Sequence, residues 1–318
     1  MRAVSVFAPA TVANVGSAFD VLGFAIAEPG DTVTAKVSST PGVTISSISG
    51  DNERLPREAN RNTAGVSVLA LLDHLRHKDP SRYGSVGITL DLSKGLPIGS
   101  GLGSSSASTV AAVLAANELL GSPLSRQELL PFAMKGEEVA CGAAHADNVA
   151  PALLGGFVLI RSYEPLDVVL LPAPSAAWTT VLSPELELKT QDARKVLKKN
   201  VTLASAISQW GNVAALVAGI YKNDVHLMGR ALEDKIVEPE RALLIPGYHD
   251  AKRAALESGA SGCSISGSGP SLFALSDSQT SAINIGEAMK SAFAAIGVGS
   301  SVYVSQVNSQ GATVLHRE

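Results

Sequence analysis

Apolar and polar positions alternate in short runs over the first 50 residues, a pattern typical of β-strands separated by turns. We predict strands at Val4–Phe7, Thr32–Val37 and Val43–Ile45, the latter two introduced by Pro-Gly turns. From Asn62 to about His77 the apolar positions recur at helical spacing, and Val86–Leu92 is predicted as a further strand.

A glycine-dense loop follows that strand and leads into the Ala-rich segment Ser104–Leu120, which we predict to be helical. The next helix is predicted over Ser125–Val139. There, Ser125 as N-cap and Glu128 three residues later form a capping-box pattern. An aliphatic run at Gly155–Ile160 predicts a buried strand.

Prolines cluster near residues 163–175, and we place a domain boundary there, with domains 1–165 and 166–318. After the boundary we predict strands at Val168–Leu171, Trp178–Leu182, Val302–Val307 and Ala312–His316, and helices at about 200–221, 224–235, 247–258 and Thr280–Ile296. Strands that come in groups predict an α+β fold, and 318 residues suit two domains.

Composition and charge restrict the kinds of molecule that this chain is expected to bind. The chain is 46% hydrophobic and 17% charged, which suits a large core and argues against a disordered chain. Its formal net charge is −4 and it has no Lys/Arg-rich run, so nucleic acid is a poor partner. No apolar stretch approaches the roughly 18–20 residues that span a membrane, and the first residues are strand-like. We therefore expect a soluble cytoplasmic protein without a membrane partner.

Residues 95–108 carry the clearest chemical signal. Gly95, Gly99, Gly101 and Gly103 fall within nine residues between a predicted strand and a predicted helix. Glycines let the backbone approach an anion closely, and the free N–H groups of a helix N-terminus attract phosphate. The serines Ser104–Ser106 add hydroxyl oxygens, which suit phosphate or magnesium.

The loop is not a Walker A motif, because no Gly-Lys-[Ser/Thr] follows the glycines. Pro97–Ala107 instead resembles the phosphate-binding loop of the GHMP kinase superfamily. Two further segments match: Ala8–Gly16 resembles the first motif of the superfamily, and Ser264–Phe273 the third. The resemblance implies a small-molecule kinase with an N-terminal ribosomal-S5-domain-2-like domain, a C-terminal ferredoxin-like domain, and ATP bound between them.

Within the superfamily, four segments are similar to the homoserine kinases: Pro9–Gly23, Lys135–Phe157, Thr190–Arg194 and Glu238–Tyr248. This similarity implies transfer of the γ-phosphoryl of ATP to the side-chain hydroxyl of L-homoserine, giving O-phospho-L-homoserine for threonine biosynthesis. Such an acceptor needs a carboxylate for its ammonium and arginines for its carboxylate. Two alternatives remain: a kinase for another alcohol, and a catalytically silent nucleotide-binding protein on this fold.

By resemblance, the acceptor site consists of Asn14, Asp20, His145, Asn148, Thr190, Arg194 and Arg241. Asn14 and Asp20 would hold the amino-acid end, and the two arginines would face the carboxylate. The catalytic candidates are Asn148, Arg194 and His145. Several GHMP kinases place an aspartate beside the acceptor hydroxyl, where this chain has Asn148, and an amide cannot take a proton. We therefore predict that Asn148 positions the acceptor. Asp147 either orients His145 or ends a helix.

The nucleotide site is predicted from the glycine loop and the start of the helix at 62. Its residues are Asn62, Pro97, Ile98, Gly99, Ser100, Gly101, Leu102, Gly103, Ser104, Ser105, Ser106 and Ala107. By resemblance, Mg²⁺ would bind Ser105 and Glu137, although the adjacent Glu138 leaves the choice of carboxylate open. Segment 264–273 is predicted to support the loop from the second domain, and the family resemblance implies a homodimer.

Overall fold

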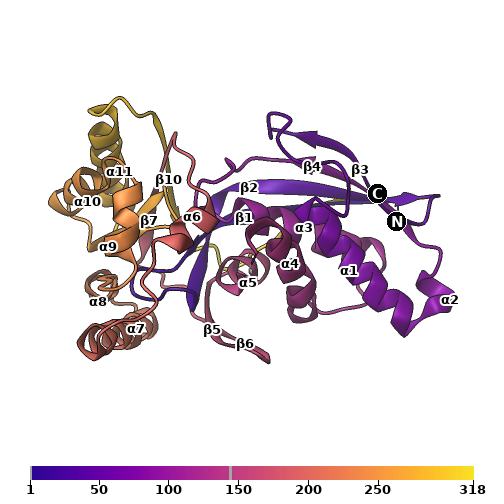
Figure 1. Ribbon diagram of the computed structural model, residues 1–318, viewed down its shortest axis with the longest axis horizontal. Helices are drawn as coiled ribbons and strands as arrows, with labels where there is room; N and C mark the ends of the chain where they lie inside the picture. Colours follow the sequence, from indigo (N-terminus) through magenta and orange to yellow (C-terminus); the bar gives the residue numbers. More distant parts are fainter. Residues whose placement is uncertain (1, 143–144) are drawn as a thin grey trace.

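The computed structural model describes residues 2–142 and 145–318 (Figure 1). The strands are β1 (Ala3–Ala13), β2 (Leu22–Ser38), β3 (Gly42–Ser49), β4 (Gly87–Ser93), β5 (Phe157–Tyr163), β6 (Leu166–Leu171), β7 (Trp178–Pro184), β8 (Gly262–Ile265), β9 (Leu272–Ser276), β10 (Ser300–Gln306) and β11 (Thr313–Arg317). The helices are α1 (Thr63–Lys78), α2 (Pro80–Tyr83), α3 (Ser104–Leu119), α4 (Arg126–Cys141), α5 (Ala146–Leu154), α6 (Thr190–Lys195), α7 (Leu203–Lys222), α8 (Val225–Ala231), α9 (Glu238–Arg241), α10 (Tyr248–Glu257) and α11 (Gln279–Ala294), with a 3-10 turn at Ala242–Leu244.

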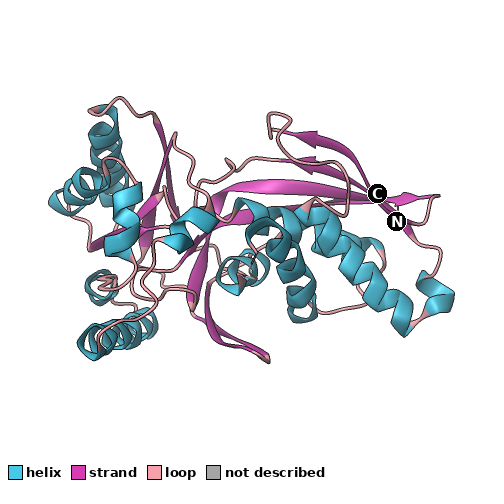
Figure 2. Cartoon of the chain, in the orientation of Figure 1, coloured by secondary structure: helices cyan, strands magenta, loops and turns pink. Residues whose placement is uncertain are grey.

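The larger sheet has the strand order β11-β1-β2-β4-β3, with β5 paired to β2 and β6 paired to β5. The 17-residue strand β2 is central to this sheet. It pairs with β1 and β4, and the first residues of β2 also pair with β5. Helices α1, α3, α4 and α5 lie together on one side of the long strands (Figure 2). α3 is buried on almost every side, because its Ala-rich sequence lets the sheet and three neighbouring helices approach it closely.

The smaller sheet is antiparallel in the order β10-β7-β9-β8. Helices between β7 and β8 and between β9 and β10 complete the ferredoxin-like arrangement, as predicted. β9 is buried on both faces: Leu272 and Ala274 pack toward α10 and α11, whereas Phe273 and Leu275 join the large core. The ring of Phe273 meets that of Phe24 edge-on with centroids 5.9 Å apart, so the larger core extends from one domain into the other.

The predicted α+β fold and most predicted elements are confirmed, including the capping box of Ser125 and Glu128. The nine-residue helix α5 was not predicted, because it is short and contains Pro151. The larger sheet also extends past the predicted boundary between residues 165 and 166. That boundary falls within the β5–β6 hairpin, and β11 pairs with β1, so the end of the chain completes the N-terminal sheet.

Candidate active site

A single cavity of about 340 Å³ extends between the glycine loop and residues of the second domain. Most of the predicted site residues line it: Asn14, Asp20, Asn62, Ile98, Gly99, Ser100, Gly101, Gly103, Ser104, Ser105, Ser106, Glu137, His145, Asn148, Thr190, Arg194 and Arg241. Residues from motifs far apart in the sequence therefore share one site.

Three loop glycines adopt the left-handed conformation that favours glycine. The φ angles of Gly99, Gly101 and Gly103 are 70°, 80° and 68°, and Gly103 is the N-cap of α3 without a side-chain cap. The first turn of α3 therefore offers its backbone N–H groups to an anion beside the loop. At Gly101 an added Cβ would lie 2.6 Å from the carbonyl oxygen of Ser266, so the second domain also excludes a side chain there.

The third motif holds the loop from behind. The Ser266 hydroxyl donates to the carbonyl oxygen of Gly101 at 2.8 Å, and the Ser271 N–H donates to that of Ser100 at 3.1 Å. From the first motif, the Thr11 N–H donates to the Leu102 carbonyl at 3.1 Å. The predicted support of the loop by segment 264–273 is therefore present, and it uses the carbonyl oxygens of Ser100 and Gly101.

Glu137 provides a buried carboxylate at the loop end of the cavity. It is 2% exposed, and burial raises its pKa against the opposing charge of Lys94. Glu137 Oε1 and Ser106 Oγ have no hydrogen-bond partner among the described residues. Unpartnered oxygens of a carboxylate and a hydroxyl are the donors that a hard cation prefers, so the residues fit Mg²⁺. Glu138 lies at the surface paired with Lys135, which favours Glu137 of the two.

Some of the predicted nucleotide residues line the cavity, and others do not. Asn62 lines the cavity but caps α1: its Oδ1 accepts the Ala64 N–H at 3.0 Å, and its Nδ2 donates to the Pro56 carbonyl at 2.8 Å. Pro97, Leu102 and Ala107 are not part of the cavity lining. Pro97 is exposed, and the side chains of Leu102 and Ala107 are buried in the hydrophobic core.

At the other end of the cavity, Arg194 connects Asp20 with His145. Arg194 Nη2 donates to both Asp20 carboxylate oxygens, at 2.7 and 3.0 Å, and to His145 Nδ1 at 3.2 Å. A guanidinium only donates, so the proton of a neutral His145 lies on Nε2. Burial, then the charge of Arg194, lowers the pKa of His145 and keeps its ring neutral near pH 7. The buried Nε2 has no partner among the described residues and is available to a ligand.

Phe19 contacts both predicted arginines. The guanidinium carbons of Arg194 and Arg241 lie 5.3 and 5.0 Å from its ring centre. Arg241 is 2% exposed and donates to the carbonyl oxygens of Gly267 at 2.8 Å and Ala193 at 3.3 Å. Burial, followed by the charge of Arg194, lowers its pKa to about 10, so it stays charged at neutral pH. The aromatic face helps to hold two like charges in one pocket.

Asn14 shapes the turn that presents Asp20. Its Oδ1 accepts the Asp20 N–H at 2.8 Å, and its Nδ2 donates to the Gly267 carbonyl at 2.9 Å. Both residues have left-handed φ angles, 57° for Asn14 and 59° for Asp20, a conformation that Asn and Asp tolerate better than most side chains. Thr190, the first residue of α6, lies 3.4 Å from Ser268 between the hydroxyl oxygens. Direct contact of Asn14 and Thr190 with a substrate stays a prediction.

Asn148 lies where the two ends of the cavity meet. Its Oδ1 accepts a hydrogen bond from the Thr11 hydroxyl at 2.8 Å. A Cβ added to Gly103 would lie 2.2 Å from Thr11 Oγ1 and 2.9 Å from Asn148 Oδ1, so only glycine fits there. With its oxygen engaged, the amide has its N–H groups left to offer a ligand.

Asp147 is a further candidate residue that the sequence left ambiguous. It is in the first turn of α5, so it does not end a helix; it is 1% exposed, and its Oδ1 has no partner among the described residues. Burial, then the negative charge of Asp20, raises its pKa to about 7. The sequence signals for Asp147 and Phe19 are weak, because their importance depends on burial and on charged neighbours from other segments.

Comparison with known proteins agrees with this geometry. Residues 66–156 match the family model "GHMP kinases N terminal domain", and residues 216–295 match "GHMP kinases C terminal". A curated homoserine kinase of Chlorobium phaeovibrioides is 52% identical, covering 99% of this chain and all of the relative. The chain belongs to the homoserine kinase family. A Xylella fastidiosa member of the family is 43% identical over 97% of this chain and 93% of its own length.

Solved structures place this family member on the same fold. The crystal structure of homoserine kinase from Cytophaga hutchinsonii has a TM-score of 0.94 and 56% identity, covering 99% of this chain and 98% of that one. The L. major mevalonate kinase, solved with R-mevalonate, has a TM-score of 0.69 at 17% identity over 95% of each chain, which shows the shared fold alone.

Proposed function

We propose that this chain transfers the γ-phosphoryl group of ATP to the side-chain hydroxyl of L-homoserine and releases O-phospho-L-homoserine. The observation that carries the proposal is the single cavity, which has phosphate-binding backbone at one end and paired arginines and carboxylates at the other. An amino acid carries both an ammonium and a carboxylate, and this end of the cavity offers both complementary charges. The names of relatives near 50% identity over the full chain point to the same acceptor.

Asp20 and Asp147 are the groups that would meet the ammonium, and Arg194 and Arg241 those that would meet the carboxylate. Without substrate, Asp20 and Arg194 neutralise each other. The carboxylate of a bound zwitterion would pair with the arginines. Its ammonium would pair with Asp20 and give Asp147 a cationic partner. Charge matching would then select an amino acid over a sugar or a simple alcohol.

Asn148 would orient the acceptor hydroxyl toward the γ-phosphate without removing its proton. Phosphoryl transfer depends mainly on alignment and on neutralising charge in a loose transition state, so direct attack with the proton passing to phosphate or water is compatible with an amide. A basic group in the pH–rate profile that disappears in Asn148→Ala would contradict this role.

Glu137, with Ser105 or Ser106, would hold a Mg²⁺ ion that accompanies ATP. The ion would shield the phosphate oxygens, while the loop amides and α3 fix their position. We expect Glu137→Gln to raise the magnesium concentration needed for half-maximal rate by about tenfold, the effect of losing about 1.4 kcal/mol of ion binding. Glu138→Gln is the matched control, and an equal shift in both variants would contradict the assignment.

The acceptor is tested with a coupled ADP-release assay on L-homoserine, D-homoserine, L-serine, L-threonine, shikimate, mevalonate and galactose. We expect turnover largely confined to L-homoserine, a raised KM for it in Arg194→Ala, and an unchanged KM in Lys195→Ala, whose side chain pairs with Asp192 at the surface. Turnover with another alcohol would keep the kinase class and overturn the acceptor. Bound ATP without any turnover would favour a silent nucleotide-binding protein.

We also propose that the enzyme is a cytoplasmic homodimer that packs through α7. The exposed face of this helix carries Leu203, Ile207, Trp210 and Tyr221, with no charged residue from 203 to 221. By length and composition α7 is also apolar enough to cross a membrane, so the prediction that no apolar stretch reaches that length was wrong for this helix. An uncharged stripe can pack against its own copy without burying a charge.

Light scattering after gel filtration tests the dimer. Trp210→Lys should halve the measured mass, whereas Ile283→Lys, an exposed apolar position on α11, should leave it unchanged. A monomeric wild-type chain would contradict the dimer, and co-sedimentation of that monomer with lipid vesicles would assign the stripe to a membrane.

A further inference from the structure

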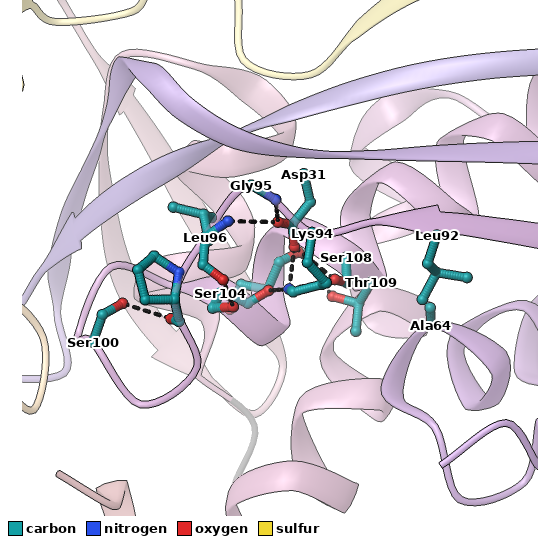
Figure 3. A network of polar contacts seen from close by, with 12 residues as sticks. Asp31, Ala64, Leu92, Lys94, Gly95, Leu96, Ser100, Ser104, Ser108 and Thr109 are labelled. Carbon is teal, nitrogen blue, oxygen red and sulfur yellow. Dashed lines mark hydrogen bonds and ion pairs between the residues drawn. The ribbon is translucent and has the colours of Figure 1, made fainter. Parts of the chain in front are cut away.

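A buried ion pair lies next to the start of the phosphate loop (Figure 3). It joins Asp31 in β2 to Lys94, the residue that follows β4, and their side chains are 1% and 2% exposed. Neither residue was among the candidate site residues predicted from the sequence. Lys94 also lines the cavity, close to the hydroxyls and the carboxylate that fit a metal ion.

The Asp31 carboxylate accepts hydrogen bonds from four donors, at the start of the loop and in α3. Its Oδ1 accepts the N–H groups of Gly95 at 3.0 Å and Leu96 at 3.1 Å. Its Oδ2 accepts the Ser108 hydroxyl at 2.7 Å and the Lys94 ammonium. The backbones are in close contact here, since a Cβ on Gly95 would lie 2.2 Å from the carbonyl oxygen of Gly30.

The Lys94 ammonium likewise donates all of its hydrogen bonds within this network. Besides Asp31 it donates to the Ser104 carbonyl oxygen and to the Ser108 hydroxyl, both at 2.8 Å. Its three protons thus have three partners, two of them in the first turns of α3. The pair therefore connects β2, the start of the loop and the helix whose N-terminus faces the cavity.

Burying two charges is costly, and apolar residues of similar volume often give equal stability at such positions. An ion pair adds direction, because each hydrogen bond fixes an angle as well as a distance. The pairing also matters electrically, since an unpaired Asp31 carboxylate beneath the loop would repel phosphate.

We infer that Asp31 and Lys94 are positioning residues for ATP: they hold the loop amides and the first turn of α3 in the geometry that binds the phosphates. The inference rests on the proposed kinase function. A purely structural pair would contribute to folding alone, whereas a positioning pair sets nucleotide affinity in a protein that is fully folded.

The test compares Asp31→Asn, Lys94→Met and the double variant. Each single change leaves a buried group unpaired, so both should melt well below the wild type. The double variant is neutral and should regain most of that loss. We expect its KM for ATP, and its Kd for a non-hydrolysable ATP analogue, to stay raised about tenfold, the equivalent of about 1.4 kcal/mol. Its KM for homoserine should match the wild type.

The matched control is Lys36→Met with Asp91→Asn. These residues form an ion pair between β2 and β4 with an N–O distance of 2.7 Å, and Lys36 is half exposed. Their loss should leave both KM values unchanged. Wild-type ATP affinity in a folded Asp31→Asn/Lys94→Met variant, or an equal rise in both KM values, would overturn the inference.

Ser108 gives a milder test in case the paired variant does not fold. Ser108→Ala removes the hydroxyl that Asp31 and Lys94 share and should raise the KM for ATP about threefold, as expected for one modest hydrogen bond. Ser108→Thr keeps the hydroxyl and should restore the affinity; unchanged ATP affinity in Ser108→Ala would overturn the inference. An inactive wild type would count against the proposed function, whereas the analogue's Kd still tests the inference itself.

Discussion

The two ends of the cavity are built in different ways. The phosphate end is essentially one stretch, residues 95–108, which presents backbone N–H groups and left-handed glycines to the cavity and should bind phosphate through them. The acceptor end collects side chains from the first motif, α5, α6 and α9, and Arg194 and Asp20 are 174 positions apart. A phosphate needs donors that adjacent amides supply, whereas a zwitterion needs opposite charges that only separate segments can bring together.

The two ends also differ in their charge. Beneath the phosphate loop, Asp31 and Lys94 neutralise each other away from solvent. At the acceptor end the charged groups are more sensitive to pH and to a ligand. The pKa of Asp147 is raised and that of His145 is lowered, and each has one buried polar atom without a partner among the residues that the structure describes. Changes at the acceptor end should therefore affect homoserine and pH dependence, and changes at the loop should affect ATP.

The largest expected effect is that of Arg241→Ala. We expect kcat/KM for homoserine to fall roughly two-hundredfold to five-thousandfold, because removing one member of a buried charged cluster costs about 3–5 kcal/mol. The KM for ATP should change little. Steady-state kinetics with each substrate varied in turn measure the split, with Arg253→Ala, an exposed arginine paired with Asp250, as control. An equal loss for both substrates would contradict the separation of the two ends.

Gly101→Ala should have the next largest effect, and the opposite selectivity. The added methyl would meet the carbonyl oxygens of Ser266 and Gly269 at a φ of 80°, so the loop must move. We expect the KM for ATP to rise about ten- to a hundredfold, equivalent to about 1.4–2.7 kcal/mol. The control is Gly297→Ala, at a φ of 77° with open space around it, which imposes the backbone strain alone. A raised homoserine KM with normal ATP affinity would break the comparison.

The acceptor end should also respond to pH through Asp147. Its pKa of about 7 in the free enzyme means that acid removes the negative charge offered to the ammonium. We expect kcat/KM for homoserine to fall about tenfold per pH unit below 7, and this acid limb to be absent in Asp147→Asn. The exposed Asp192→Asn serves as control. An unchanged acid limb in Asp147→Asn would assign the titration to another group.

Stability provides an independent check on the same residue. A carboxyl whose folded-state pKa lies above its unfolded value of 3.8 weakens the folded state progressively between pH 3.8 and about 7, and by a constant amount at higher pH. Asp147→Asn should therefore melt higher than the wild type at pH 8, and the difference should shrink toward pH 4. Thermal unfolding at the two pH values measures it.

The smallest expected effect lies at Gln209 on α7. Its side-chain Nε2 donates to the Ser17 carbonyl at 2.7 Å and to Asp234 Oδ1 at 2.8 Å. Asp234 in turn accepts the N–H groups at the start of α9, the helix that carries Arg241. Gln209→Ala should raise the KM for homoserine about threefold, a loss of about 0.6 kcal/mol typical of a modest hydrogen bond. Asn212→Ala, which removes a bond to the Glu233 carbonyl only, should not.

Much of the fold and one end of the site follow from short-range patterns. The glycine spacing in 95–103 predicts left-handed turns, and Gly99, Gly101 and Gly103 adopt them. The capping box of Ser125 and Glu128 starts α4 as predicted. These features depend on neighbours within a few positions, so the local sequence contains the information that specifies them.

The convergence of distant side chains was decided by the tertiary structure. Asp31 and Lys94 are 63 positions apart and look like an ordinary turn aspartate and loop lysine, yet the pairing of β2 with β4 buries them together. Phe19 contacts two arginines only because the fold brings α6 and α9 next to segment 9–23. The sequence by itself determined which backbone is suited to phosphate, because conformation and N–H groups are local properties. The fold decided which charges are buried and paired, because burial and electrostatic interaction depend on distance in space and not along the chain.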